Sequence, residues 1–155
     1  MTIFDQFVKS KTVDLYGWVI KILVDHDLGR WSETEELPEG DTPAISISEL
    51  GTKSIRALGV NLYTLNTDVE PGVDKMGVTF RIRTPESNPL AAVELADKLE
   101  DVFHGREHNI FKSWHIPVMW RHSLADLGPN ENDHYQLTDT YHFYVDVYRE
   151  AADNG

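Results

Sequence analysis

The hydrophobic positions near the start of the chain recur every three or four residues, a spacing that places side chains on one face of an α-helix. The apolar stripe consists of Val13, Tyr16, Ile20, Leu23 and Val24. Gly29 is a residue type common at helix ends. The pattern predicts a helix over about residues 12–28, followed at 31–43 by WSETEELPEGDTP, an acidic loop without periodicity.

From Ala44 onward the hydrophobic positions recur every second residue, which is the period of a β-strand. This period predicts strands at about 44–50, 60–66 and 76–84. The third alternates most strictly, with Met76, Val78, Phe80 and Ile82 on one face and Thr79, Arg81 and Arg83 on the other. We expect the apolar face to meet a core and the polar face to meet water or a partner.

Between the second and third strands, residues 66–75 contain a Pro-Gly pair and predict a long hairpin tip. The clearest helix follows at about 89–103. Asn88 is its expected N-cap, Pro89 fits the first helical position and Gly105 is the stop signal.

Two further strands are predicted at about 116–125 and 134–149, joined by the polar turn DLGPNEND. The order helix, three strands, helix, two strands predicts one α+β domain over residues 1–155. We expect a mostly antiparallel sheet of about four to five strands, with the N-terminal helix and the second helix packed on one face.

The chain has 14 Lys and Arg residues against 26 Asp and Glu, a formal net charge of -12 at pH 7. This charge argues against a surface that grips nucleic-acid phosphates over a broad area. The lack of cysteine excludes disulfide scaffolds, thiolate zinc sites and a cysteine nucleophile. The apolar run YGWVIKILV is well short of the roughly 20 residues that span a bilayer, and the first residues include no basic leader, so we expect no membrane association.

His122, Ser123 and Asp126 supply the residue types of a hydrolytic triad. On a regular strand at 116–125, neighbouring side chains point to opposite faces, so His122 and Ser123 would not meet as base and nucleophile. No glycine pair provides the sharp turn on which a nucleophilic serine is usually exposed. We therefore expect a polar strand end that runs into a hairpin, and no catalytic residues.

Three histidines, His104, His108 and His115, offer imidazole ligands for zinc. Gly105 separates the first two and should end the helix that would align them, and no HExxH pattern occurs. The acidic loop lacks the DxDxDG spacing of a calcium loop, and no glycine-rich phosphate loop precedes a helix. We expect loop or capping histidines, a solvated acidic loop, and neither a metal nor a cofactor.

Two groups of side chains remain as candidates for protein contacts. Arg81 and Arg83 share the outer face of an internal strand, where they either cover a solvated sheet face or dock onto carboxylates of a neighbouring copy. Tyr144 and Tyr148, beside His142 in the last strand, exceed what a solvent-facing strand needs. Tyrosine is enriched where proteins meet, so we interpret this face as an interface.

Two long stretches carry a pattern of elements and junctions: RIRTPESNPLAAVELADKLEDVFHG and VMWRHSLADLGPNENDHYQLTDTYHFYVDVYRE. An Arg-rich strand runs into a helix that ends in HG, and a later strand carries Arg, Ser and LG before a polar turn. The last strand matches D-x-Y-x-x-V-x-V in slightly shifted register, with Asp139, Tyr141, Tyr144, Val145 and Val147. This pattern, over about residues 12–149, resembles the tail terminator proteins of long-tailed bacteriophages, which are minor capsid or tail-completion proteins.

The resemblance implies a structural role without catalysis. Proteins of this kind assemble as a ring, typically of six copies, on the head-proximal end of the tail tube, where they end tube growth and meet the head connector. The expected partners are other copies of the chain, the tail tube protein and the head-tail connector protein, with DNA passing through the lumen without specific binding. The expected location is the tail or neck of the virion, after assembly in the cytoplasm of a bacterial host.

A ring in head-to-tail contact needs two complementary patches on each copy. The sequence offers the arginine face, with Arg81 and Arg83, and the acidic loop, with Glu33, Glu35 and Glu36. Which face lines the channel is left open.

The hairpin tip adds the carboxylates of Asp68, Glu70 and Asp74. We expect this tip and the acidic loop to be poorly packed in a lone subunit and to order on the tube end. Two other functions stay open: a head-side connector or stopper protein, and a small enzyme or ligand-binding domain unrelated to phages. The latter predicts a pocket with convergent polar groups around His122 and His142.

Overall fold

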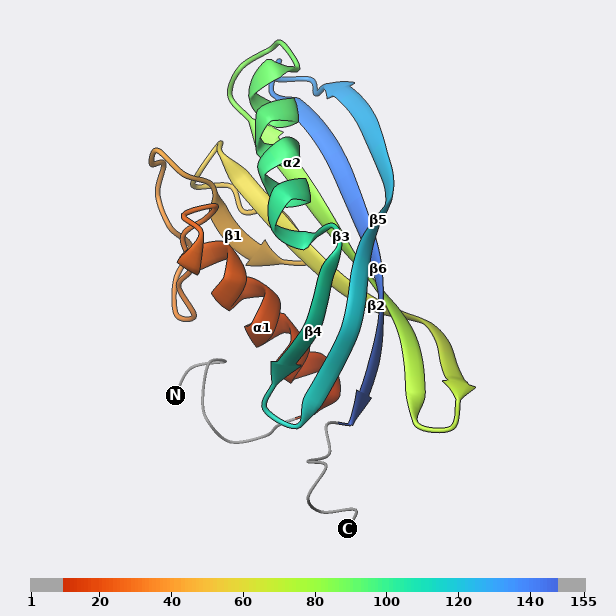
Figure 1. Ribbon diagram of the computed structural model, residues 1–155. Coiled ribbons are helices and arrows are strands. Elements are labelled where there is room, and N and C mark those ends of the chain that lie inside the picture. Colours follow the sequence, from red (N-terminus) through yellow and green to blue (C-terminus); the bar gives the residue numbers. More distant parts are fainter. Residues whose placement is uncertain (1–9, 148–155) are drawn as a thin grey trace.

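The computed structural model describes residues 10–147, which form two helices and a six-stranded sheet. In chain order the elements are α1 (Lys11–Asp25), β1 (Ala44–Ile47), β2 (Ala57–Glu70), β3 (Val73–Thr84), α2 (Leu90–Phe103), β4 (Arg106–Phe111), β5 (Trp114–Pro129) and β6 (Tyr135–Val147). The sheet order is β1-β2-β3-β6-β5-β4, and all these neighbours pair antiparallel except β1 with β2. Figure 1 shows both helices on the same side of the curved sheet, which confirms the predicted α+β class.

The core lies between the helices and the sheet face that they cover. Helix α2 buries Ala92, Ala96, Leu99 and Phe103, which recur at helical spacing. The Phe103 ring lies 5.1 Å from Phe80 on β3 and 5.9 Å from Tyr141 on β6, measured between ring centroids. These contacts fix α2 across the centre of the sheet, because offset and tilted aromatic pairs add about 0.5–1.5 kcal/mol to the burial of their area.

Helix α1 begins where Ser10 Oγ accepts the backbone N–H of Val13, and it ends at Asp25, earlier than the predicted limit. The predicted apolar stripe is rotated from the true buried face: Val13 and Val24 are exposed, whereas Asp14 is fully buried. A buried carboxylate breaks the periodicity from which the stripe was predicted. Neither described helix has the length and apolar character needed to cross a bilayer.

The sheet has one strand more than the predicted four to five. Strand β4 was missed because its sequence, REHNIF, shows no run of alternating apolar residues. It is the edge strand beside β5, with Glu107 and His108 exposed, and His108 has a φ of 52°.

The prediction of a hairpin at 66–75 is confirmed, but its strands extend further into this segment than the predicted long tip allows. Strands β2 and β3 extend to Glu70 and Val73, and the turn between them contains Gly72 with a φ of 80°. Beyond the body of the sheet the two strands pair only with each other, as Figure 1 shows. Such a ribbon faces water on both sides, so its polar sequence does not alternate and resembles a loop.

Candidate interaction surfaces

The outer face of the sheet, opposite the helices, is polar along its centre. Thr79 and Thr140 bring their hydroxyls within 3.1 Å, and the Tyr63 hydroxyl lies 3.4 Å from Thr79 Oγ1. Tyr63 also closes over Gly77, where a Cβ atom would lie 2.5 Å from the ring. This part of the outer face is therefore a hydrogen-bonded layer.

One end of the outer face holds an aromatic cluster of Lys75, Trp120, His122, His142 and Tyr144. The His122 and His142 rings stack at 3.9 Å, Trp120 lies 5.5 Å from Tyr144, and Lys75 Nζ lies 5.7 Å from the Trp120 ring. Burial, followed by the nearby charges of His122 and Lys75, lowers the pKa of His142. Tyr144 thus lies on the predicted face, whereas Tyr148 is outside the described residues.

The predicted separation of His122 and Ser123 onto opposite faces was wrong. A register shift lies between Arg121, opposite Tyr141, and Ser123, opposite Thr140. This bulge interrupts the alternation, so both residues lie beside outer-face partners: His122 stacks on His142 and Ser123 pairs with Thr140. Asp126, predicted in the turn, lies instead within β5 opposite Leu137, where it accepts the backbone N–H of Gly128 at 2.7 Å beside a register shift.

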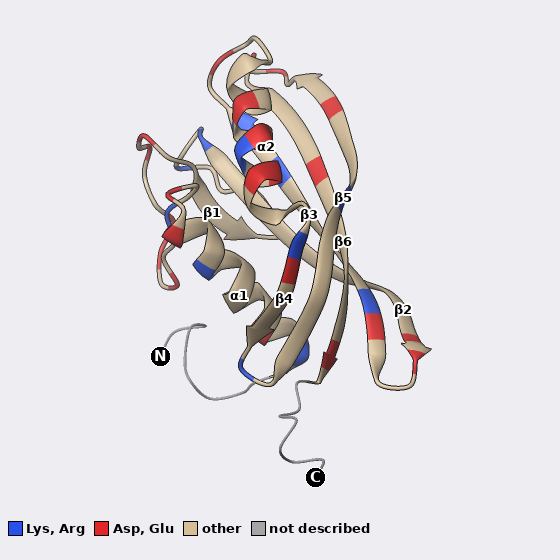
Figure 2. Ribbon diagram, viewed as in Figure 1, with Lys and Arg blue, Asp and Glu red and all other residues tan. Residues whose placement is uncertain are grey.

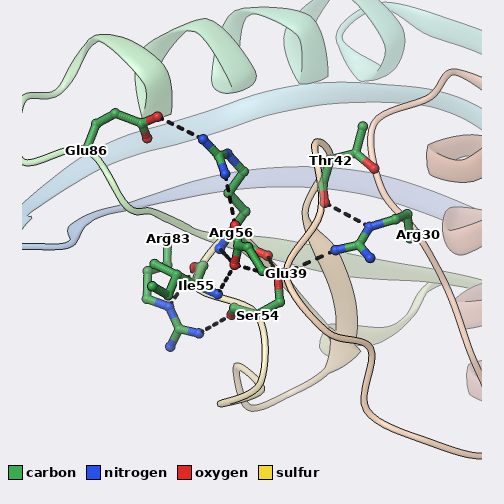
Figure 3. Close-up of polar contacts among 8 residues, drawn as sticks. All are labelled: Arg30, Glu39, Thr42, Ser54, Ile55, Arg56, Arg83 and Glu86. Carbon is green, nitrogen blue, oxygen red and sulfur yellow. Dashed lines mark hydrogen bonds and ion pairs between the residues drawn. The ribbon is translucent and has the colours of Figure 1, made fainter.

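The two arginines of the predicted arginine face have different environments. The exposed Arg81 donates from Nη2 to Gln136 Oε1 at 2.9 Å. Arg83 bends back to segment 51–56, where it donates to the carbonyls of Ile55 at 2.9 Å and Ser54 at 2.7 Å (Figure 3). Burial, and then the charge of Arg81, lowers the pKa of Arg83. Arg83 is therefore used within its own chain.

The acidic loop is attached to segment 51–56 by two of its glutamates. Glu36 accepts the backbone N–H groups of Thr52 and Lys53, and Glu39 accepts those of Ile55 and Arg56. Arg56 also forms ion pairs with Glu39, at 2.9 Å from Nη1 to Oε1, and with Glu86, at 3.1 Å from Nη2 to Oε1 (Figure 3). The backbone N–H donors lower the pKa of Glu36. Desolvation acts to raise the pKa of Glu39, but the hydrogen bonds that Glu39 accepts outweigh it, so this pKa is lowered as well. Glu36 and Glu39 are exposed, as Glu33 and Glu35 are, but their hydrogen bonds attach a part of the loop that was expected to be poorly packed.

The hairpin tip is acidic, as Figure 2 shows. Asp74 forms an ion pair with Lys11 at the start of α1 and accepts the backbone N–H of Asp68 at 3.0 Å. The Lys11 hydrogen bond is the main reason why the pKa of Asp74 is lowered. Glu70, by contrast, is exposed, and within residues 10–147 its carboxylate takes no ion pair or hydrogen bond.

Residues of the two recognised stretches meet in a buried polar hub under α2. Arg121 donates to Asp139 at 2.8 and 3.0 Å, to Glu100 at 2.6 Å and to the Ala96 carbonyl at 3.0 Å. Tyr141 donates to Asp139 at 2.9 Å. Burial raises the pKa of Asp139 and of Tyr141. Desolvation alone would lower the pKa of Arg121, but the hydrogen bond to Asp139 outweighs it, so the pKa of Arg121 is raised and its guanidinium stays charged. These motif residues hold the fold together.

A second buried ion pair joins α1 to the β4–β5 turn, and sequence reasoning did not find it. Asp14 accepts Lys112 Nζ at 3.0 Å and Trp114 Nε1 at 2.8 Å. The Asp14 side chain is fully buried and that of Lys112 is 6% exposed. The contact joins residues far apart along the chain, so no local pattern indicates it.

The three histidines considered as zinc ligands have separate partners. His104 Nδ1 accepts the backbone N–H of Arg121 at 2.9 Å, and His115 pairs with Asp146 at 2.9 Å. The ring of His108 stacks 6.4 Å from that of His115. Over the described part of the chain, no three or more His, Asp or Glu side chains form a group that would hold a metal ion.

Comparison with known proteins finds similarity among solved structures. No protein-family model and no curated protein matches the sequence. Among solved structures, the fold matches a chain of the "Virion of native gene transfer agent (GTA) particle" with a TM-score of 0.56 and 10% sequence identity, covering 93% of this chain and 91% of that one. At this identity, the match establishes a shared fold along nearly the whole chain.

Proposed function

We propose that the chain is a structural protein of a phage-like virion, and more specifically a tail terminator that caps the head-proximal end of the tail tube as a ring. The observation that supports this most is the fold shared with a virion chain over 93% of the present chain. The resemblance of the Arg121 and Asp139 strands to tail terminator sequences supports the finer assignment independently of that match. Fold alone does not determine function, so the finer assignment needs a direct test.

The use of the polar residues is consistent with an assembly protein. Arg121, Asp139 and Tyr141, the polar residues that carry the family pattern, are joined in the hub that attaches α2 to the sheet. His122 and His142 stack in the aromatic cluster, and Trp120 and Tyr144 beside them are half-buried on a face that no described helix covers. Such residues are enriched at protein interfaces.

The charge of the chain is consistent with a DNA channel. A formal net charge of -12 would repel DNA phosphates and keep the genome from binding to the wall of the ring. The ring, its expected six copies, the tail tube and the head-tail connector are all parts of this proposal.

The test is electron microscopy of particles produced after deletion of the gene that encodes the chain. Full heads beside unjoined tails of overgrown or variable length support a tail terminator. Leaking heads beside tails of normal length instead identify a head-side connector, which overturns the finer assignment and leaves a virion protein. Intact infectious particles overturn both and direct the search to a ligand near His122 and His142.

A further inference from the structure

We infer that copies of the chain join head to tail, with the β2–β3 hairpin tip of one copy seated in a hollow beside Arg81 on the outer face of the next. This inference rests on the proposed ring, because it identifies the contact that builds it. The two surfaces are different parts of each copy, so the contact is heterologous and repeats from copy to copy until a ring closes.

The hairpin tip has the properties of an unpartnered contact surface. It extends beyond the sheet, and every residue from Thr64 to Gly72 is exposed. Val69 is 46% exposed although it is apolar. Glu70 beside it has a carboxylate without an ion pair or hydrogen bond to the described residues. The tip therefore offers two exposed apolar side chains, Leu65 and Val69, and the negative charges of Asp68 and Glu70, neither of which has an ion pair with the described residues.

The hollow on the outer face has a volume of about 440 Å³ and offers the opposite charge. Gly59 and Leu127 are among its lining residues, and Leu127 is 50% exposed. Arg81 projects there with Gln136 as its hydrogen-bond partner and without an ion pair within residues 10–147. Glu49 also lines the hollow, and Arg81 is the cation among its lining residues that an acidic tip would contact.

A copy cannot fill its own hollow. Glu70 lies opposite Val73 in the hairpin, and Arg81 lies further along the same strand as Val73. At about 3.3 Å per residue, the eight steps from Val73 to Arg81 separate the two sites by roughly 26 Å of extended strand. The occupant that matches both the charge and the apolar side chain is therefore the tip of a second copy.

The structure also favours this pair over the other charged surfaces. Arg83 donates hydrogen bonds to the carbonyls of segment 51–56, and Glu36 and Glu39 of the acidic loop accept hydrogen bonds from the N–H groups of that segment. Arg81 donates only to the neutral Gln136 side chain, and neither Arg81 nor Glu70 forms an ion pair with the described residues. Each thus has a net charge to offer to a neighbour, and opposite charges across an interface set its register and partner choice.

The first experiment reverses each charge and then mixes the variants. Arg81→Glu alone and Glu70→Arg alone should each weaken self-association at least about tenfold, because like charges meet at every contact. In an equal mixture, the tip of each variant fits the hollow of the other, so association should return as alternating copies. Lys53→Glu and Glu131→Arg reverse exposed charges elsewhere and should leave association unchanged.

The second experiment detects the contact even where association is weak. The chain has no cysteine, so Glu70→Cys with Arg81→Cys in one chain should give a ladder of disulfide-linked multimers on oxidation. Glu131→Cys with Arg81→Cys should not. If Arg81→Glu and Glu70→Arg each form rings as readily as the wild type, and the Glu70→Cys, Arg81→Cys chain gives no ladder, the inference is overturned and the proposed function stands. A missing ladder together with intact infectious particles after gene deletion overturns both.

Discussion

Arg121 and Asp139 face each other at two points, with Nε 2.8 Å from Oδ1 and Nη2 3.0 Å from Oδ2. The Asp139 side chain is fully buried, and the same guanidinium reaches Glu100 and the Ala96 carbonyl on α2. One arginine therefore joins β5, β6 and α2. A buried pair of this kind adds little beyond what packed apolar residues would give, but the loss of one partner leaves an uncompensated buried charge.

Arg121→Ala should lower the free energy of unfolding by about 3–5 kcal/mol, since Asp139 stays buried without its cation. Urea unfolding followed by circular dichroism measures the change. Lys98→Ala removes an exposed pair with Glu94, whose atoms lie 3.5 Å apart, and should cost no more than about 0.5 kcal/mol. Equal costs for the two variants would mean that the hub does not hold α2 to the sheet.

The sequence predicts best those elements whose local pattern and tertiary role agree. The second helix has Asn88, whose side chain accepts the Leu90 N–H at 3.0 Å, and Gly105, whose φ is 76°. Strand β3 has alternating apolar residues that all meet the core. Strand β4 was missed, and the β2–β3 hairpin was predicted with strands that are too short, because edges and ribbons in water do not require apolar alternation.

The candidate surfaces were only partly predictable for a different reason. Arg81 and Tyr144 lie on the outer face as alternation indicates, because strand period fixes the side of a sheet. The hydrogen bonds from Arg83 to the Ser54 and Ile55 carbonyls depend on the path of the loop between β1 and β2, which no local sequence pattern encodes. The bulge at His122 likewise depends on pairing between β5 and β6.

Asp14→Ala should lower the free energy of unfolding by about 3–5 kcal/mol, because the buried Lys112 would lose its ion pair with the Asp14 carboxylate. Thermal unfolding measures the loss. Replacing both partners, Asp14→Leu with Lys112→Met, should recover part of the stability, since no buried charge is left. Asp25→Ala removes an exposed partner of Lys21 on the same helix and serves as the control. A double variant less stable than Asp14→Ala would contradict this account.

Gly77→Ala should cost about 1–2 kcal/mol, because the new Cβ displaces the Tyr63 ring and breaks its contact with Thr79. Urea unfolding again gives the difference. In a Tyr63→Ser background the same substitution meets no ring and should be neutral or stabilising by up to about 1 kcal/mol, since glycine is unfavourable within strands. A similar cost in both backgrounds would show that Tyr63 is not the obstacle.

The anchoring of the acidic loop should make stability depend on pH in the acid range. The pKa values of Glu36 and Glu39 are lowered from the ordinary value of 4.5 by the N–H groups of segment 51–56. A lowered folded-state pKa gives stability that is present above the unfolded value and is lost as pH falls through the folded one. Glu39→Gln should therefore be less stable than wild type at about pH 7, and the gap should narrow at about pH 3. Urea midpoints at the two pH values measure it, with exposed Glu35→Gln as control. A gap that is constant with pH would mean that the Glu39 charge does not hold the loop.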